Sequence, residues 1–380
     1  MSRKVKKVLA MLLILIGTLS IGSMNVMASQ SQKADLGIVV DIESVSIDRQ
    51  PSNLLAGIGT MSVNKNLVVG NTSVPLYATF DSQEAALQNI STNPVVQEIK
   101  LEYGYEDISD DNWKDYYDAM HELIDLPSCP DWYNEEAVSF RTMRKFFDIY
   151  ENHEKNEEIV SLVTRATAAT DITENADLLE LLPYDSYIAL SQQSNISNNE
   201  RSLASLNALG FNINAAVAYA SKYAKSPNTD DYDKFSSDCT NFVSQILENG
   251  GVSQVKYDDQ KKGWWHTKSK VLYITVHKHS ISWIRANTFA KYMGVGYTTT
   301  NNSLFSANIK KGDFIAADYE KDGDWNHMGF VTSKKTSKTN GYYDYKVAQH
   351  TKNYHAWASS STNSWEKIGK DGGKYGRVRR

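Results

Sequence analysis

The spacing of apolar residues divides the first half of the chain into segments of different secondary structure. Partial alternation of apolar and polar positions predicts extended segments over residues 38–47 and 67–80. An apolar repeat close to the helical period predicts helical segments at residues 82–99, 112–125, 135–165 and 171–182. This half of the chain is therefore expected to mix helices and strands.

The second half shows a different order of segments. Residues 213–224 form an alanine-rich helical pattern that follows Asn212, a residue type that caps helices. Short strands separated by turn signals are expected at residues 314–319, 328–333, 342–350 and 374–378. Helices followed by several short strands predict an α+β fold, with helices packed on an antiparallel sheet.

A polar stretch marks the junction between the two halves. Residues 193–207 are polar and poor in aromatic side chains, a composition typical of a linker. The predicted organisation is therefore an amino-terminal mixed α/β region of unknown function at residues 35–192 and a second domain at residues 208–380.

The first residues have the pattern of an export signal. A basic head precedes an apolar stretch from Val8 to Ile21 and a group of small residues, which together predict a secretory signal peptide at residues 1–28. An uncleaved amino-terminal anchor is the alternative. No other stretch is apolar enough to span a bilayer, so no stable membrane insertion is expected after cleavage. The mature protein is expected to be secreted or extracellular, and an association with the cell wall fits this location.

Charge and cysteine content limit the partners and the reactions that are expected of the chain. The net charge is −5, with acidic and basic residues mixed and no long basic stripe, so a nucleic-acid partner is not expected. The chain has two cysteines, Cys129 and Cys239. They could form a disulfide in an exported protein, or Cys239 could be kept reduced and used chemically. The sequence leaves both open.

Cys239 lies where a nucleophile is expected. Asp238 is a good helix N-cap, and the apolar residues that follow at helical spacing place Cys239 in the first turn. Free backbone N–H groups and the helix dipole would then favour the thiolate and lower the pKa of Cys239. The same N–H groups can hold the oxyanion of a tetrahedral intermediate.

Histidines in the strand-rich tail supply a candidate base. His327 lies at a turn that leads into a strand, and it is expected to take the proton of the Cys239 thiol. His350 ends the next strand, and a hairpin would place it beside His327 as the orienting group. Asn353 is the first alternative as orienting residue, and Asn326 is the second.

Aromatic residues and possible metal ligands are the remaining candidates. Trp264, Trp265 and Trp283 are expected either to line a substrate groove or to pack in the core. Cys239 and the histidines are ligand types for zinc, but they lack the short paired spacings of common zinc sites. No metal or other cofactor is therefore expected.

Several motifs in the second half resemble a known family. They are D-C-T-N-F-V-S-Q at residues 238–245, Trp264-Trp265, Ser282-Trp283, Lys311-Gly312-Asp313, His327 and Gln349-His350-Thr351, in that order. Together with the alanine-rich helix they resemble the bacterial Putative amidase domain, a family grouped with the papain-like cysteine hydrolases. The resemblance covers about residues 208–380.

This resemblance implies both a fold and an activity. It implies a papain-like fold and an amidase or peptidase that cleaves amide bonds through an acyl-enzyme. It also implies Cys239 as nucleophile, His327 as base and His350 as the third member of a Cys-His-His set. A peptide or peptidoglycan-like substrate fits an exported enzyme of this kind. A non-catalytic binding module for wall polymer or a partner is the alternative, and residues 35–200 could serve as an inhibitory prodomain.

Overall fold

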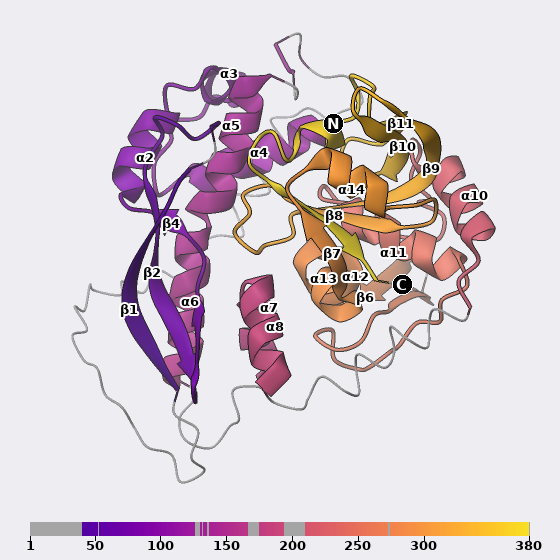
Figure 1. Cartoon of the computed structure of the whole chain (residues 1–380), viewed down its shortest axis with the longest axis horizontal. Coiled ribbons are helices and arrows are strands. Elements are labelled where there is room, and N and C mark those ends of the chain that lie inside the picture. The colour runs from indigo at the N-terminus through magenta and orange to yellow at the C-terminus, as the bar shows by residue number, and fades with distance from the viewer. Residues whose placement is uncertain are drawn as a thin grey trace. The chain divides into compact units, whose positions relative to one another are not determined.

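The structure is a computed structural model of the chain (Figure 1). It describes residues 40–51, 53–125, 130, 132–134, 137–165, 175–193, 210–272 and 274–379. The predicted signal peptide, Cys129 and nearly all of the predicted linker lie outside these residues. Residues from Lys33 to Arg380 belong to one compact unit. Within the described residues, no helix combines the length and hydropathy that crossing a membrane requires.

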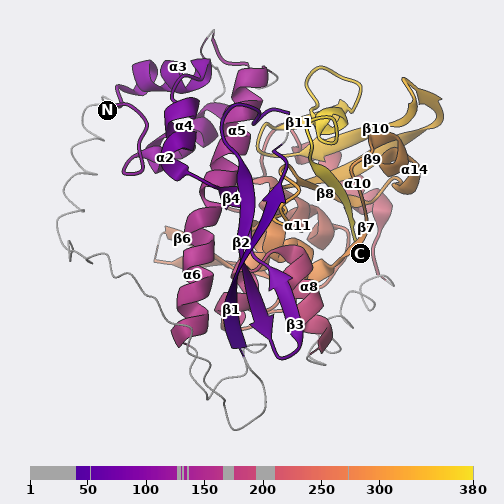
Figure 2. The same cartoon turned by 60° about the vertical axis from the view of Figure 1, so that its left-hand side comes forward.

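The amino-terminal region begins with a four-stranded antiparallel sheet (Figure 2). Its strands are β1 (Val40–Arg49), β2 (Met61–Val69), β3 (Thr72–Pro75) and β4 (Thr79–Phe80). Strand β2 pairs with each of the other three. The strand predicted over residues 38–47 is confirmed in its described part as β1. The extended segment predicted over residues 67–80 forms the end of β2 together with β3 and β4.

Helices follow this sheet along the chain, and their aromatic side chains pack together. They are α2 (Gln83–Ile90), α3 (Pro94–Tyr103), α4 (Trp113–Asp125), α5 (Val138–Tyr150) and α6 (Asn152–Arg165). The helical segment predicted over residues 82–99 is divided in two, because Asn93 caps a new helix that opens on Pro94. The helix predicted over residues 112–125 is confirmed as α4. Trp113 of α4 stacks on Phe147 of α5 in the core of this region.

Helices α7 (Ala176–Leu181) and α8 (Tyr184–Gln193) contact both halves of the chain. Leu178 and Leu190 pack in a cluster with residues of β2. Tyr184 packs in the core of the second half, and its hydroxyl accepts a hydrogen bond from the Val295 N–H at 2.7 Å. The domain boundary at residues 193–207 stays a prediction, but the helix directly before it already packs on the second half.

The second half is built on a six-stranded antiparallel sheet with the order β11-β10-β9-β8-β12-β7. Its strands are β7 (Val295–Thr299), β8 (Phe314–Asp318), β9 (His327–Thr339), β10 (Tyr342–Gln349), β11 (Tyr354–Trp357) and β12 (Lys374–Val378). The predicted strands are confirmed as β8, β9, β10 and β12. The sequence does not predict β7 and β11, because both are short edge strands without a clear alternation.

Helices cover both faces of this sheet. On one face lie α10 (Ile213–Tyr223), α11 (Cys239–Asn249) and α13 (Ala286–Met293), whose buried side chains pack with Met328 and Phe330 of β9. On the other face lie α14 (Asn302–Asn308) and a 3₁₀ helix (Trp365–Lys367). The remaining elements are β5 (His266–Val271), β6 (Ile274–His279) and α12 (Ile281–Ile284). Helices combined with antiparallel sheets agree with the predicted α+β class at this level.

Candidate active site

The loop before α11 is held by a network around Asp238. Its Oδ1 atom accepts hydrogen bonds from the Phe235 N–H at 3.0 Å and from the Asn241 amide at 2.8 Å. Its own N–H donates to the Thr351 hydroxyl at 2.8 Å. Asp238 occupies the N-cap position of α11, but its side chain makes no capping hydrogen bond, so the prediction of a capping carboxylate is wrong. The first N–H groups of α11 are therefore left uncapped by this carboxylate.

His350 completes this network through a contact with Asp238. Its Nδ1 atom lies 2.5 Å from Asp238 Oδ2, and its Nε2 atom donates to the Tyr223 carbonyl at 2.9 Å. Its ring stacks on Phe242 with the ring centroids 3.7 Å apart. Both ring nitrogens are thus engaged away from His327. The prediction that His350 orients His327 is corrected, since the imidazole instead fixes the loop that precedes α11.

Cys239 is the first residue of α11 and carries a free thiol that is 5% exposed. Its Sγ lies 3.6 Å from the Thr240 hydroxyl, and the backbone N–H groups of Met328 and Thr240 also bond to it. Burial raises the pKa of the Cys239 thiol above its usual value, and these hydrogen bonds offset only part of the increase. The prediction of a lowered pKa is wrong, because burial raises the pKa more than the hydrogen bonds to the sulfur lower it, and the charge of Asp238 raises it further.

Alkylation of Cys239 tests this protonation state. With a raised pKa, the thiolate fraction is small at neutral pH and grows as the pH passes the ordinary thiol value of about 8.5. The rate of reaction with iodoacetamide, followed by peptide mass mapping, is expected to be still increasing above about pH 9. Thr240→Val removes a hydrogen bond that lowers the pKa, so it should move the curve to higher pH. A rate that reaches its plateau below neutral pH would contradict this account.

Cys239 and His327 line one cavity of about 470 Å³. His327 is the first residue of β9 and is buried. Its ring lies against Tyr319 and Trp365, with centroid separations of 6.2 Å and 5.8 Å. The next residue along β9, Met328, supplies an N–H group to the Cys239 sulfur. The predicted nucleophile and the predicted base therefore both line the same cavity.

The alternation of side chains along β10 separates His350 from His327. Ala348 lies in the core under α11, so His350 shares that face of the sheet and Gln349 points to the opposite face. Gln349 Oε1 accepts a hydrogen bond from Trp365 Nε1 at 2.7 Å, and the same indole contacts His327. Gln349 also lines the cavity. Gln349 belongs to the motif Gln349-His350-Thr351, but the motif alone indicates no role for it.

The three tryptophans predicted as possible groove residues lie in the core. Trp264, Trp265 and Trp283 are at most 3% exposed, and the rings of the first and third stack 4.8 Å apart. The Trp283 indole N–H donates to Asn241 Oδ1 at 2.8 Å. Substrate contact by these rings is therefore corrected to core packing. The tryptophan in the described cavity wall is Trp325.

Residues of the amino-terminal region form part of the cavity wall, which the sequence analysis did not predict. They include Tyr117, Met120, His121, Arg144, Asp148 and Lys155, from α4, α5 and α6. His121 Nδ1 lies 3.2 Å from the Ser237 hydroxyl, two residues before Cys239. Burial, with a smaller effect of Arg144, lowers the pKa of His121 to about 4, so its ring is neutral at neutral pH. Nothing in the sequence distinguishes these polar residues from the other polar residues of α4 and α6.

Side chains of α5 and α6 also hold the β8–β9 loop, residues 319–326, which leads into His327. Lys145 Nζ donates to Glu320 Oε1 at 2.7 Å and to the Tyr319 carbonyl. Two further pairs are Asn152 with Asp322 Oδ2 at 2.8 Å and Lys155 with Asp324 Oδ2 at 2.6 Å. Because the loop ends at the first residue of β9, these contacts fix where the histidine strand begins.

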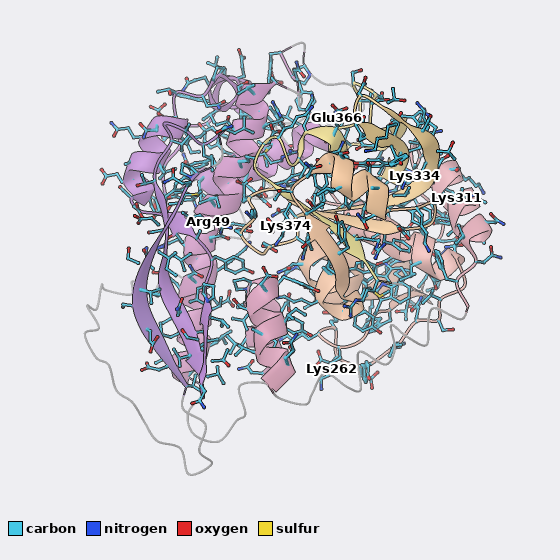
Figure 3. The ribbon with its side chains drawn as sticks, viewed as in Figure 1. Arg49, Lys262, Lys311, Lys334, Glu366 and Lys374 are labelled. Atoms are coloured by element: carbon cyan, nitrogen blue, oxygen red, sulfur yellow. The ribbon has the colours of Figure 1, made fainter. Side chains whose placement is uncertain are left out.

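The charges of buried acids in and beside this loop are only partly balanced by neighbouring lysines. Lys374 of β12, labelled in Figure 3, pairs with Asp318 Oδ2 at 3.2 Å. Burial nevertheless raises the pKa of Asp318 to about 6 and that of Glu320 to about 7. Within the described ranges, no group of three or more His, Cys, Asp or Glu side chains is arranged to hold a metal ion.

Comparisons with known proteins agree with the position of this site. Residues 210–375 match the family described as "Putative amidase domain", which supports assigning this part of the chain to that family. Over 119 residues the chain is 33% identical to the uncharacterized protein YhbB of Bacillus subtilis (strain 168), covering 31% of this chain and 36% of that protein. Over 161 residues it is 28% identical to the uncharacterized protein YjcM of the same organism, covering 39% and 34%. The chain thus spans about a third of the length of these curated relatives. No solved structure matches it.

Proposed function

We propose that this chain is a cysteine hydrolase that cleaves amide bonds, with Cys239 as nucleophile and His327 as base. The observation that carries the proposal is that both residues line one cavity, at the start of α11 and at the start of β9. The match of residues 210–375 to an amidase family supports the reaction class.

A neutral thiol makes general-base attack the fitting route. His327 takes the thiol proton as Cys239 Sγ attacks the carbonyl carbon, which gives a tetrahedral oxyanion. The N–H groups at the start of α11, among them that of Thr240, lie beside the sulfur and can donate to that oxyanion. His327 then protonates the leaving amine, the C–N bond breaks, and a thioester acyl-enzyme remains.

Water completes the cycle at the same carbonyl. His327 takes a proton from a water molecule, whose oxygen attacks the thioester. The carboxylic acid product, which contains the former acyl group, leaves the site. His327 returns the proton to the Cys239 sulfur. The acyl-enzyme is therefore the intermediate that an experiment should detect.

Gln349 replaces His350 in this proposal as the group that orients His327. It lies in the cavity wall and shares the Trp365 contact with His327, whereas both ring nitrogens of His350 are bound elsewhere. An amide oxygen can accept an imidazole N–H, and related thiol hydrolases use an amide side chain in this role. Asn353 is not among the described residues that line the cavity.

A papain-like fold, export and a wall substrate belong to the same proposal. Helix α11 carries the cysteine and packs on the strand that carries the histidine, which is the arrangement that the family resemblance implies. An exported amide hydrolase would meet peptides and the peptide cross-links of the wall. We therefore include a peptide or peptidoglycan-like substrate in the proposal.

Digestion of purified peptidoglycan tests the proposed function. The chain without residues 1–28 is expected to release fragments with a new amine and a new carboxyl group, identified by mass spectrometry. Acid quenching during turnover should trap the acyl fragment on the Cys239 peptide. Protein whose Cys239 has been blocked with iodoacetamide is the matched control and should release nothing. Equal release by the blocked protein would refute the cysteine mechanism, and wall binding without any release would favour the binding module.

A further inference from the structure

Asp148 is a cavity residue that the proposed reaction does not use. It lies on α5, is 9% exposed, and lines the cavity together with Cys239 and His327. Its Oδ2 atom is buried and has no hydrogen-bond partner among the residues that the structure describes. A buried carboxyl oxygen without a partner is costly, so a group that enters the cavity and bonds to it would be stabilised.

The neighbouring acids differ from Asp148 because each has a partner. The pairs are Glu320 with Lys145, Asp322 with Asn152, and Glu151 with Lys155. Burial, and next the charge of Glu320, raises the pKa of Asp148 well above its usual range, while Arg144 opposes this more weakly. The surroundings of Asp148 are therefore negative, which disfavours an anionic ligand and favours a cation.

Other parts of the cavity wall suit an organic cation. The ring of Tyr117 lines the cavity, and aromatic faces attract ammonium groups, whereas Lys155 Nζ already lies 5.4 Å from the centroid of the Tyr77 ring. The cations already present have other contacts, since Lys155 pairs with two carboxylates at 2.6 Å each and Arg144 lies 4.2 Å above the Tyr319 ring. A volume of about 470 Å³ leaves room for a group of side-chain size.

We propose that Asp148 binds a primary ammonium group of the substrate and so selects amide substrates that carry a free amine. This inference rests on the proposed function, because it assumes that the cavity receives the substrate of Cys239. Binding of the ammonium group would favour the ionised form of Asp148, whose proton passes to solvent, and the two charges would then form an ion pair. A substrate without the amine would leave Asp148 unpaired. Asp148 is therefore a specificity-determining residue and takes no part in bond breaking.

Acetylation of the free amines of peptidoglycan tests this selection. For the wild type, kcat/KM is expected to fall by about 10-fold or more after acetylation, because a buried charge pair is lost. Asp148→Asn keeps the shape of the side chain, so it should show a similar loss on the untreated substrate and no response to acetylation. Glu154→Gln makes the same chemical change at an exposed position of α6 and should behave as the wild type. A wild type that ignores acetylation would overturn the inference.

Titration with n-pentylammonium and n-pentanol, followed by NMR on the mature chain, separates this inference from the proposed function. The wild type is expected to prefer the ammonium compound, whereas Asp148→Asn and Asp148→Ser should bind both compounds alike. Unchanged thermal unfolding midpoints would show that the variants are folded. If the preference holds but nothing is hydrolysed, the ammonium site stands and the proposed reaction falls. Equal binding by the wild type, or a preference that survives in both variants, would overturn the inference and leave water as the partner of Asp148.

Discussion

Replacing Cys239 by alanine is expected to lower kcat for amide hydrolysis by at least about 10³-fold. The variant has no sulfur to form the thioester, so both chemical steps lose their intermediate. Alanine is the best helix former and Cys239 is the first residue of α11, so the helix should persist. Steady-state rates on wall fragments, read beside circular dichroism spectra, separate loss of chemistry from loss of fold.

Substitutions of the two histidines are expected to have different effects on kcat and on stability. His327→Ala should reduce kcat to a similar extent, and adding it to Cys239→Ala should cost little more, because the two residues act as a unit. His350→Gln breaks the contact with Asp238, so it should lower the free energy of unfolding by about 1–3 kcal/mol, with a smaller effect on kcat. Retention of more than about a tenth of the activity by Cys239→Ala would refute the nucleophile assignment.

The sequence predicts that Cys239 starts a helix and that His327 lies where a strand begins, because both positions depend on local features. A helix start after a polar loop and a strand start after a turn can each be recognised within about ten residues. The helix that carries Cys239 and the strand that carries His327 are both present in the structure at those places. Their shared cavity then follows from packing a helix terminus against the end of the adjacent strand.

The residue that we propose to orient His327 could not be predicted, because its place on the sheet depends on strand register. Moving by one residue along a strand transfers a side chain to the other face of the sheet, so Gln349 and His350 point to opposite sides. The pairing of β9 with β10 shifts in register near Tyr345 and again between Lys346 and Val347. No periodic pattern in the sequence places such irregularities.

Burial and long-range contacts account for the other differences. The sequence predicts the start of the helix at Cys239, but the sign of the pKa shift of this thiol depends on burial by residues from far along the chain. The tryptophans fit a groove or a core equally well until their exposure is known. Likewise, Lys145 contacts a loop 174 residues further along the chain, which no local signal reveals.

Lys145→Met is expected to lower the free energy of unfolding by about 3–5 kcal/mol and to lower kcat as well. The side chains of Lys145 and Glu320 are only 3% and 1% exposed, with their charged atoms 2.7 Å apart. Removing the ammonium group leaves the buried Glu320 carboxyl without its cation and the Tyr319 carbonyl without this donor. Because the β8–β9 loop leads into His327, the effect should fall on kcat more than on KM.

Two comparison variants isolate the buried pair. Lys114→Met removes a lysine whose pair with Glu154 is exposed, so it should cost no more than about 1 kcal/mol. The double variant Lys145→Met/Glu320→Leu removes both buried charges and should recover most of the lost stability. Urea unfolding gives the free energies, and hydrogen exchange of residues 319–327 reports the loop. Wild-type stability and wild-type loop exchange in Lys145→Met would contradict the role assigned to this pair.

The pH dependence of stability provides an independent check on Glu320. Its pKa is raised to about 7 in the folded chain, mainly by burial and in spite of Lys145, whereas glutamate in an unfolded chain titrates near about 4.3. The folded state therefore binds the proton of Glu320 more tightly than the unfolded state does. The contribution of this proton to the free energy of unfolding is fully present below about pH 4 and is lost as the pH rises through about 7. Lys145→Met should extend this decline to higher pH, because the cation that favours ionisation is gone. Glu320→Gln should make the decline shallower, and an unchanged pH dependence in both variants would mean that other buried acids of the loop control the titration.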